Sequence, residues 1–426
     1  MTRRLRRSIT GVVVASALSG CGRAAPPTLV VHAESSPVEA QSVVPQLTLL
    51  SGGRMLLSWQ RPLDGGGYAF EMAVKDGGQW SDVRTIAEGP KLSMFGSDLP
   101  AVATLAGTKL LAYWEVTEEG YNATTIETAI SSDDGRSWMP ASTPYEQALP
   151  GQHSFISSFG IENGIGLVWL DASVRSHVHA GIPDQDRHAQ HDLGSVGLRY
   201  AALKADGTVD HEQFVDPIAC ECCPTGAAST DRGPVIVYRD RQELSGTRPA
   251  DVRTFQPTVR DIYIIRQENG VWQPPRLVHN DNWIINACPD NGPAVDASGN
   301  HVAVAWWTGS NNQPKVQVAF SSDSGDSFGS AFRVDSGDGE GQVTVALLPN
   351  GRSAVVGWLE NGETWARYVS DSGATSSPAP LGSSPRHSRL PRWLANRDGS
   401  VTAAWTSKKD GSPHVEVSRI DWHHDR

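Results

Sequence analysis

The sequence has no excess of basic residues and, beyond Cys21, no run of 18 apolar residues. Its 426 residues include 36 Lys and Arg against 47 Asp and Glu, which gives a net charge of -11. Nucleic acids and anionic membrane surfaces attract basic proteins, so neither is expected as a partner of the folded chain. The missing apolar run also excludes a transmembrane helix after Cys21.

Tyrosine and phenylalanine are scarce, whereas tryptophan and glycine are abundant. The chain has 8 Tyr and 9 Phe but 14 Trp, together with 42 Gly and 27 Pro. Disordered proteins are poor in aromatic residues, so this composition excludes a largely disordered chain. The many Gly and Pro residues predict many turns.

The first twenty residues have the features of an export signal. Four arginines make its beginning basic: Arg3, Arg4, Arg6 and Arg7. The apolar segment 11–18 follows and is too short to span a bilayer. It ends in Leu18-Ser19-Gly20-Cys21, which resembles the bacterial lipobox, where cleavage precedes a cysteine that is then acylated. A plain secretory signal with a chance cysteine is the alternative.

The lipobox resemblance implies a lipoprotein signal peptide at 1–20 and a lipidated tether at 21–27, with the lipid on Cys21. The folded domain is then expected at 28–426. Gly22 follows the cysteine, and by analogy with other lipoproteins this favours sorting to the outer membrane over retention in the inner membrane. We expect a monomer in the bacterial cell envelope that touches the membrane only through its N-terminal lipid.

An apolar strand that ends in an aromatic residue recurs seven times. The aromatics are 47 to 69 residues apart and are Trp59, Trp114, Trp169, Tyr238, Trp306, Trp358 and Trp405. A Gly-containing turn and another short apolar segment precede each of these strands. An alternating strand follows, most clearly at 124–130 and 315–320. Four strands in each unit of roughly fifty residues are typical of the blades of a β-propeller.

The repeat therefore predicts an all-β fold, a β-propeller of four-stranded antiparallel blades, with seven blades favoured and six possible. Radial stacking buries both faces of each blade, so the recurring aromatics are expected to wedge between blades. The last unit has no fourth strand after 414–420. The N-terminal segment 28–32 is expected to supply that strand and to close the ring.

Two turns between strands share a sharper motif, Ser-x-Asp-x-Gly-x-x-Trp. The first has Ser131, Asp133, Gly135 and Trp138 at its four fixed positions, and the second has Ser321, Asp323, Gly325 and Phe328. The Asp is expected to accept N–H groups of the turn, the Gly to adopt a positive φ, and the aromatic to pack over the loop. With these turns the chain resembles the sialidase-like, BNR/Asp-box β-propellers over nearly all of its length after the signal.

The resemblance implies an exo-sialidase-like glycosidase that acts on an acidic glycan at the mouth of the central channel. The family holds the substrate carboxylate with three arginines, and it uses a Tyr–Glu pair and an acidic Asp. Where its Arg-Ile-Pro motif belongs, this chain has Val43-Val44-Pro45, although an echo occurs at Arg389-Leu390-Pro391. No Tyr–Glu pair can be assigned, so the catalytic set is incomplete. The remaining candidates to bind the carboxylate are Arg239, Arg241 and Arg260.

Residues just before the innermost strands should converge at one mouth of the channel. Sixteen positions before the seven aromatics stand Val43, Asp98, His153, Cys222, Asp290, Gln342 and Arg389. Asp98, Asp290 and Arg389 are the predicted catalytic residues, with one of the two Asp as proton donor. His153 and Gln342 are predicted to bind substrate together with the three arginines named above. The alternative is that such positions are simply polar loops.

Four cysteines besides Cys21 strengthen the prediction of a site at the mouth. Cys220, Cys222 and Cys223 precede one inner strand and Cys288 precedes the next, so the four should cluster between adjacent blades. In an oxidising compartment an even number of cysteines predicts two disulfides. Pairing across the blades is preferred, because a bridge between the neighbours Cys222 and Cys223 would be strained.

A soft-metal site is the alternative to disulfides, and otherwise no cofactor is expected. His177 and His179 lie in a long loop near the cysteines, and thiolates combined with imidazoles suit copper or zinc. Two functions thus remain open. One is a glycan-directed propeller that binds or hydrolyses an acidic sugar. The other is a non-catalytic envelope protein with a Cys/His metal site or a scaffold role.

Overall fold

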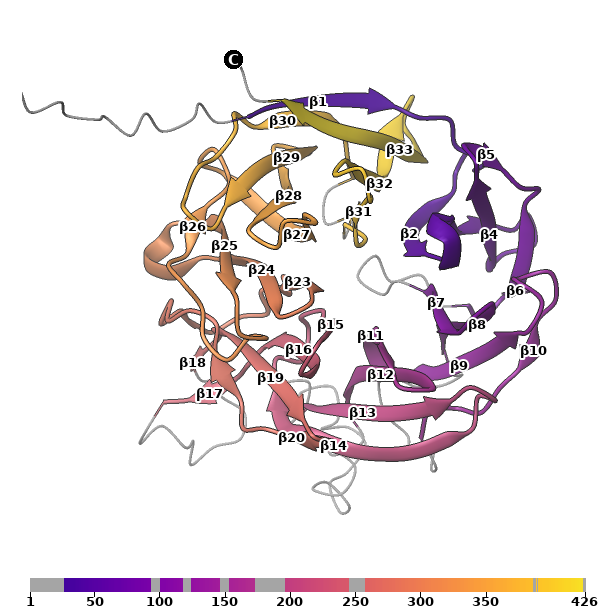
Figure 1. Ribbon diagram of the computed structural model, residues 1–426, viewed down its shortest axis with the longest axis horizontal. Helices are drawn as coiled ribbons and strands as arrows, with labels where there is room; N and C mark the ends of the chain where they lie inside the picture. Colours follow the sequence, from indigo (N-terminus) through magenta and orange to yellow (C-terminus); the bar gives the residue numbers. More distant parts are fainter. Residues whose placement is uncertain are drawn as a thin grey trace, which may run out of the picture.

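The structure is a computed structural model that describes residues 27–92, 100–117, 124–145, 153–172, 196–244, 257–385, 388 and 390–423. Across these residues the chain forms seven antiparallel blades around a central axis (Figure 1). The prediction of a seven-bladed, all-β propeller is therefore confirmed over the alternative of six. The 3-10 turns η1 (Ser51–Gly53) and η3 (Ser310–Asn312) are short. No helix in the described part is long and apolar enough to cross a membrane.

The first three blades follow one another along the chain, each starting at the axis. The first contains β2 (Val43–Leu49), β3 (Met55–Pro62), β4 (Tyr68–Asp76), β5 (Gln79–Trp80) and β6 (Arg84–Gly89). The second contains β7 (Ala101–Ala106), β8 (Lys109–Thr117), β9 (Thr124–Ser131) and β10 (Met139–Pro140). The third contains β11 (His153–Ile161), β12 (Gly164–Asp171), β13 (Val196–Lys204) and β14 (Val209–Ala219).

The next three blades have the same order. The fourth contains β15 (Gly226–Thr230), β16 (Gly233–Arg239), β19 (Ile262–Glu268), β20 (Val271–Trp272) and β21 (Arg276–Leu277). A small separate sheet joins β17 (Gln242–Glu243), β18 (Thr258–Val259) and β22 (Ile284–Ile285). The fifth contains β23 (Ala294–Ser298), β24 (His301–Thr308), β25 (Lys315–Ser321) and β26 (Phe332–Arg333). The sixth contains β27 (Gly339–Leu347), β28 (Ser353–Glu360), β29 (Glu363–Ser370) and β30 (Ala379–Ser383).

The seventh blade is made from both ends of the described chain. Strands β31 (Leu394–Ala395), β32 (Val401–Lys409) and β33 (Ser412–His423) come from the C-terminal part, and β1 (Thr28–Ala33) adds the outer strand. β1 and β33 pair antiparallel, from Thr28 opposite His423 to Ala33 opposite Ser418 (Figure 1). This pairing confirms the predicted closure by the N-terminal strand, which removes an exposed sheet edge.

The seven recurring aromatics are all buried. Trp114 of the second blade contacts Phe70 of the first, with ring centroids 6.2 Å apart. Trp358 of the sixth blade packs in one cluster with Val318 of the fifth. Its indole N–H donates to Glu360 at 2.7 Å, so the ring is buried without leaving its polar atom unpaired. The recurring aromatics therefore pack between neighbouring blades, as predicted.

The two motif turns have the same hydrogen bonds. In the first, Asp133 Oδ1 accepts the N–H four residues later at 2.9 Å, and Ser131 Oγ accepts the N–H of Gly135 at 2.7 Å. Asp323 makes the equivalent bond at 2.9 Å. Gly135 and Gly325 have φ values of 78° and 79°, which favour glycine. The motif therefore builds a turn, as its residues predict.

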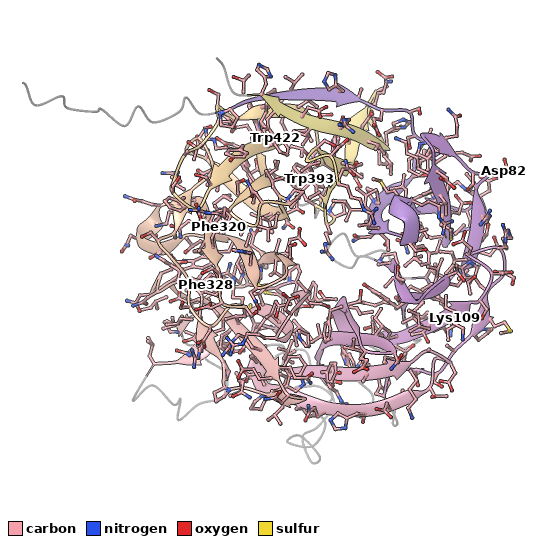
Figure 2. All side chains as sticks on the ribbon, in the orientation of Figure 1. Asp82, Lys109, Phe320, Phe328, Trp393 and Trp422 are labelled. Carbon is pink, nitrogen blue, oxygen red and sulfur yellow. A yellow bond between two sulfur atoms is a disulfide. The ribbon has the colours of Figure 1, made fainter. Side chains whose placement is uncertain are left out.

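The aromatic positions of these turns extend the packing between blades. Trp138 packs against the cluster between the first and second blades, and Phe328 against the cluster between the fourth and fifth. Figure 2 shows Phe328 toward the rim of the propeller, far from the axis. The motif therefore stabilises the outer part of the fold and leaves the channel to other residues.

Candidate functional site: the central channel and a cysteine cluster

The seven inner strands enclose a cavity of about 700 Å³ on the propeller axis. Every blade contributes to it, through β2, β7, β11, β15, β23, β27 and β31. The polar side chains among its described lining residues are Gln46, Thr48, Thr104, Tyr113, Ser157, Ser158, Thr225, Asp296, Ser298, Gln342, Thr344, Arg392, Asn396 and Arg397. Hydroxyl and amide groups dominate this set, and they suit a ligand that has many hydroxyl groups.

Three of the inner strands begin with the same irregularity. The pairing register shifts between Val43 and Gln46 in β2, between Ser154 and Ser157 in β11, and between Gly341 and Thr344 in β27. A residue with positive φ lies within each shift. Such bulges redirect side chains and are common next to ligand sites. They place the residues that follow, among them Gln46 and Ser157, on the channel wall.

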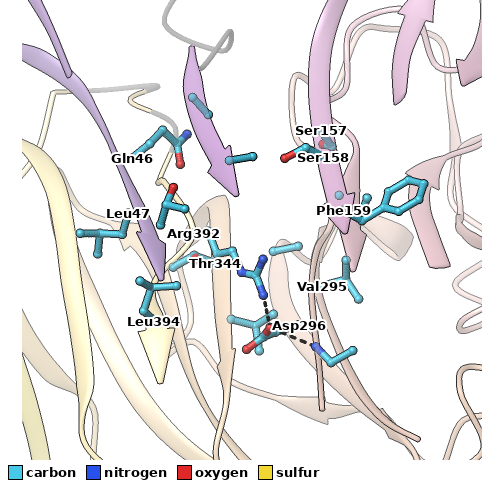
Figure 3. A pocket seen from close by; sticks show the side chains of 18 of the residues that line it. Gln46, Leu47, Ser157, Ser158, Phe159, Val295, Asp296, Thr344, Arg392 and Leu394 are labelled. Carbon is cyan, nitrogen blue, oxygen red and sulfur yellow. Dashed lines mark hydrogen bonds and ion pairs between the residues drawn. The ribbon is translucent and has the colours of Figure 1, made fainter. Parts of the chain in front are cut away.

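Arg392 and Asp296 form an ion pair on the channel wall, and Arg397 is a further charged lining residue. Arg392 Nη2 donates to Asp296 Oδ1, and its side chain is 46% exposed against 11% for Asp296 (Figure 3). Asp296 also accepts the backbone N–H of Leu347 at 2.9 Å and of Ala297 at 3.0 Å. The carboxylate is therefore held from three sides. It anchors a guanidinium whose other edge faces the cavity.

The four cysteines meet between the fourth and fifth blades, close in sequence to the cavity-lining residues Pro224 and Gly292. Cys222 and Cys288 form a disulfide with Cα atoms 6.2 Å apart. Cys220 and Cys223 are free thiols that are completely buried, with their sulfurs 3.1 Å apart. The predicted clustering and the preference for pairing across blades agree with this geometry. The prediction of two disulfides is wrong for this cluster, because Cys222 and Cys288 are bonded whereas Cys220 and Cys223 are not.

Charged residues surround the free thiols. Arg260 Nη1 donates to Cys220 Sγ at 2.8 Å and to Glu221 at 3.2 Å. Burial opposes ionisation of Cys220, but the contact with Cys223 and the charge of Arg260 outweigh it and lower the pKa of Cys220 to about 7. Burial and the neighbouring Cys220 raise the pKa of Cys223 well above its usual value. Cys220 is therefore the thiolate of the pair.

Arg239 and Arg260 are not presented to the channel. Both are completely buried, and the donors of Arg239 bind the backbone carbonyls of Asn291, Arg260 and Trp307. This corrects the expectation that these two arginines bind a substrate carboxylate. Sequence pattern identifies an arginine but not the carbonyl oxygens that a neighbouring blade directs at it. Arg241 pairs with Glu221 at 3.4 Å, beside the cysteines.

His153 is also withdrawn from the channel. Its ring is 1% exposed, stacks on Tyr145 with centroids 4.6 Å apart, and has Nδ1 3.3 Å from Asp171. Asp171 belongs to the same blade as His153, and Tyr145 follows the last strand of the blade before it. The imidazole is therefore buried between two blades. This corrects the expectation that His153 touches a substrate.

Asp290 and Gln342 are brought together, as the alignment of the repeats predicts. Gln342 Nε2 donates to the backbone carbonyl of Asp290 at 2.7 Å, and its own N–H donates to Asn291 at 2.7 Å. Gln342 lines the cavity, whereas Asp290 is not among the lining residues. The other predicted residues, Asp98, Arg389, His177, His179 and Cys21, lie outside the described part of the chain.

The disulfide reduces the number of thiols that the cysteine cluster can offer to a soft metal. The sulfurs of Cys220, Cys222 and Cys223 lie within 4.8 Å of one another. Cys222, however, is bonded to Cys288, so among the described residues two thiols remain as ligands. Copper or zinc binding therefore stays a prediction that depends on histidines outside the described residues.

Arg392 and Asp296 were missed by the sequence reasoning. Arg392 stands 13 positions before Trp405, and Asp296 stands 10 positions before Trp306. The residues predicted at the starts of the inner strands, in contrast, all stand 16 positions before the recurring aromatics. An inner strand exposes alternate residues to the channel along its length, so several columns contribute. The available signal was a carboxylate within the short inner strand β23 and an arginine two residues before the inner strand β31.

Comparison with known proteins finds no matching family model and no matching curated protein. Several solved structures are similar over most of this chain. A Dyadobacter fermentans protein of unknown function is 13% identical, with 94% of this chain and 99% of that chain covered and a TM-score of 0.47. Penicillium chrysogenum alpha-L-arabinanase, complexed with arabinobiose, is 11% identical, with 94% of this chain and 98% of that chain covered and a TM-score of 0.48. Trypanosoma rangeli sialidase is 12% identical, with 81% of this chain and 56% of that chain covered and a TM-score of 0.40. At these identities and scores the likeness assigns no activity to this chain.

Proposed function

We propose that this protein binds an acidic sugar or glycan in its central channel. The observation that carries the proposal is Arg392, a half-exposed guanidinium on the wall of a cavity that is also lined by hydroxyl and amide side chains. A guanidinium binds a carboxylate through two parallel hydrogen bonds. Hydroxyl and amide groups such as those of Gln46, Ser158 and Asn396 match the hydroxyl groups of a sugar ring.

The described residues favour binding over hydrolysis. Most glycosidases need two carboxyl groups, roughly 5 to 9.5 Å apart, one of which must be protonated. Asp296 is the one carboxylate among the described residues that line the cavity. It accepts hydrogen bonds from Arg392 and from two backbone N–H groups, so both of its oxygens are already engaged within the protein. Asp98 and Asp290 remain the predicted acids of a hydrolytic alternative.

We place this binding function in the bacterial cell envelope. The lipobox-like segment that ends at Cys21 supports export and a lipid anchor. A propeller tethered in this way would present its channel to soluble saccharides outside the cytoplasm. Labelling with a radioactive fatty acid, compared with a Cys21→Ser variant, tests the anchor independently of ligand binding.

Calorimetric titration with uronic and sialic acids, and with the matching neutral sugars, tests the proposal. The acidic sugars should bind more tightly, and Arg392→Ala should weaken them at least tenfold, or by about 1.4 kcal/mol, without affecting neutral sugars. Arg352→Ala is the matched control, because Arg352 pairs with Asp371 on the surface. Equal binding of acidic and neutral sugars, or no effect of Arg392→Ala, would contradict the proposal.

Asp296→Asn separates binding from hydrolysis. The amide oxygen still accepts the N–H of Leu347, but the negative charge beside Arg392 is lost. A binding protein should then hold an acidic sugar as tightly as before or more tightly. Turnover of fluorogenic glycosides that disappears in this variant would instead show that Asp296 serves hydrolysis.

A further inference from the structure

The cysteine cluster combines a disulfide at the surface with a buried pair of thiols. Cys288 is exposed and Cys222 is half-buried, whereas Cys220 and Cys223 are completely buried. The sulfur of Cys220 lies 3.9 Å from that of Cys222 and 3.1 Å from that of Cys223. A nucleophile and a disulfide are thus already next to each other. A purely structural disulfide requires no such neighbour.

We propose that the four cysteines form a thiol–disulfide exchange site, in which Cys220 attacks Cys222 and releases Cys288 at the surface. Exchange needs a thiolate within reach of a disulfide sulfur. Arg260 supplies the positive charge that stabilises this thiolate, through its 2.8 Å contact with Cys220. This function is separate from ligand binding in the channel and does not depend on it.

The first step moves the disulfide inward. The Cys220 thiolate forms a bond to Cys222 Sγ, the bond between Cys222 and Cys288 breaks, and Cys288 leaves as a thiolate that takes up a proton from solvent. In the second step Cys223 loses its proton and attacks Cys220, and Cys222 leaves as a thiolate that is protonated in turn. One disulfide and two thiols are present before and after, so the rearrangement needs no external oxidant.

The rearrangement changes what the protein offers to its surroundings. Afterwards Cys222 and Cys288 form an accessible dithiol between the fourth and fifth blades, while the bond between Cys220 and Cys223 is buried. The accessible dithiol can reduce a disulfide of low molecular weight, which is cleaved into two thiols while the bond between Cys222 and Cys288 forms again. A small disulfide is thus the substrate class, because of the four clustered cysteines only Cys288 is exposed.

Trapping of Cys288 in a Cys223→Ser variant of the full chain tests this proposal. The variant keeps Cys220 beside Cys222 but removes the Cys223 thiol. The second exchange step therefore cannot occur, and Cys288 can be released only by attack of Cys220 on Cys222. A bulky maleimide is added without reductant, and labelled Cys288 is quantified by peptide mass spectrometry. We expect nearly complete labelling, because attack of Cys220 on Cys222 releases the Cys288 sulfur to the maleimide.

The matched control is the double variant Cys220→Ser with Cys223→Ser, which keeps the surface disulfide without any nucleophile. It should stay unlabelled until a phosphine reductant is added, and labelling after reduction shows that the maleimide reaches Cys288. Equal labelling of both variants without reductant would overturn the proposal, as would an unlabelled Cys223→Ser variant that becomes labelled after reduction. If Cys223→Ser does not fold, as judged by circular dichroism, Cys223→Ala serves in its place.

Discussion

Arg260 Nη1 donates to the Cys220 sulfur at 2.8 Å, and both side chains are completely shielded from solvent. A buried guanidinium needs a negative partner, because removing an isolated charge from water is costly. Glu221 provides one such partner at 3.2 Å. The Cys220 thiolate provides the second. The same contact therefore makes the Cys220 thiol more acidic and makes the burial of Arg260 less costly.

Replacement of Arg260 should therefore change the acidity of Cys220. We expect Arg260→Gln to raise the pKa of Cys220 by about 1 unit or more, since burial then acts without an opposing charge. The pH dependence of the thiolate ultraviolet absorbance, measured in a Cys223→Ser background, reports this pKa. Arg241→Gln is the control, because Arg241 pairs with Glu221 at 3.4 Å, whereas the donor to the Cys220 sulfur is Arg260. An equal shift in both variants would show that the effect is not local.

The disulfide should contribute strongly to the stability of the ring. Cys222 and Cys288 are 66 residues apart, and closure of a loop of this length is worth about 4 kcal/mol in the chain-entropy description. We expect the double variant Cys222→Ser with Cys288→Ser to lose about 2–4 kcal/mol in urea unfolding without reductant. The double variant Cys220→Ser with Cys223→Ser, which keeps the bond, should lose less. Equal losses would mean that packing of the cysteines, not the bond, stabilises the junction.

The stability of the fourth blade should depend on pH through Asp240. Burial raises the pKa of this carboxyl to about 6 from its ordinary 3.8, and repulsion from Asp216 adds to the effect. The folded state therefore favours the protonated acid. The protonated carboxyl is fully present below about pH 4, where Asp240 does not lower the free energy of unfolding. As the pH rises through about 6 the carboxyl ionises in the folded state, and the free energy of unfolding falls by up to about 3 kcal/mol.

Asp240→Asn should remove this dependence. The amide oxygen can still accept the backbone N–H of Arg241, which lies 2.7 Å from Asp240 Oδ1. We expect the variant to be more stable than the natural protein by about 1–2 kcal/mol at about pH 8, and no more stable at about pH 4. Urea unfolding at both pH values measures the difference. A gain that is the same at both would exclude titration of Asp240 as its cause.

The motif turn of the fifth blade should tolerate alanine poorly. At Gly325, with φ 79°, an added Cβ would lie 2.6 Å from Ile264 Cδ1. Gly270 has nearly the same φ, 78°, but nothing within 4 Å of its added Cβ. Both substitutions incur the left-handed backbone penalty of about 1–2 kcal/mol, and Gly325→Ala should lose a further 1–3 kcal/mol or so from overpacking. Thermal unfolding compares the two, and equal losses would leave the backbone as the sole cause.

Much of the fold could be predicted because its determinants are local. Strand alternation, turn glycines and the aromatic at the end of each second strand are properties of neighbouring residues. Even the distant pairing of β1 with β33 could be foreseen, since the seventh unit lacked a strand and the segment 28–32 had no other partner. The junction of the cysteines followed from their positions before adjacent inner strands.

The site could be predicted only in part. Gln342 and Asp290 do meet, but His153, Arg239 and Arg260 are buried between or within blades. Whether a polar residue faces the channel or a neighbouring blade depends on bulges and on groups that the next blade provides. A single alignment column contains neither kind of information.

By itself, the sequence determined that the chain forms blades, how the ring closes and where the cysteines gather, and it favoured seven blades over six. The tertiary structure alone decided that Arg392 faces the cavity while Arg239 binds carbonyl oxygens, and that Cys222 bonds Cys288 while Cys220 stays a thiol. The physical reason is that strand formation follows from interactions between near neighbours. Burial, charge pairing and sulfur contacts arise only where two separately formed blades touch.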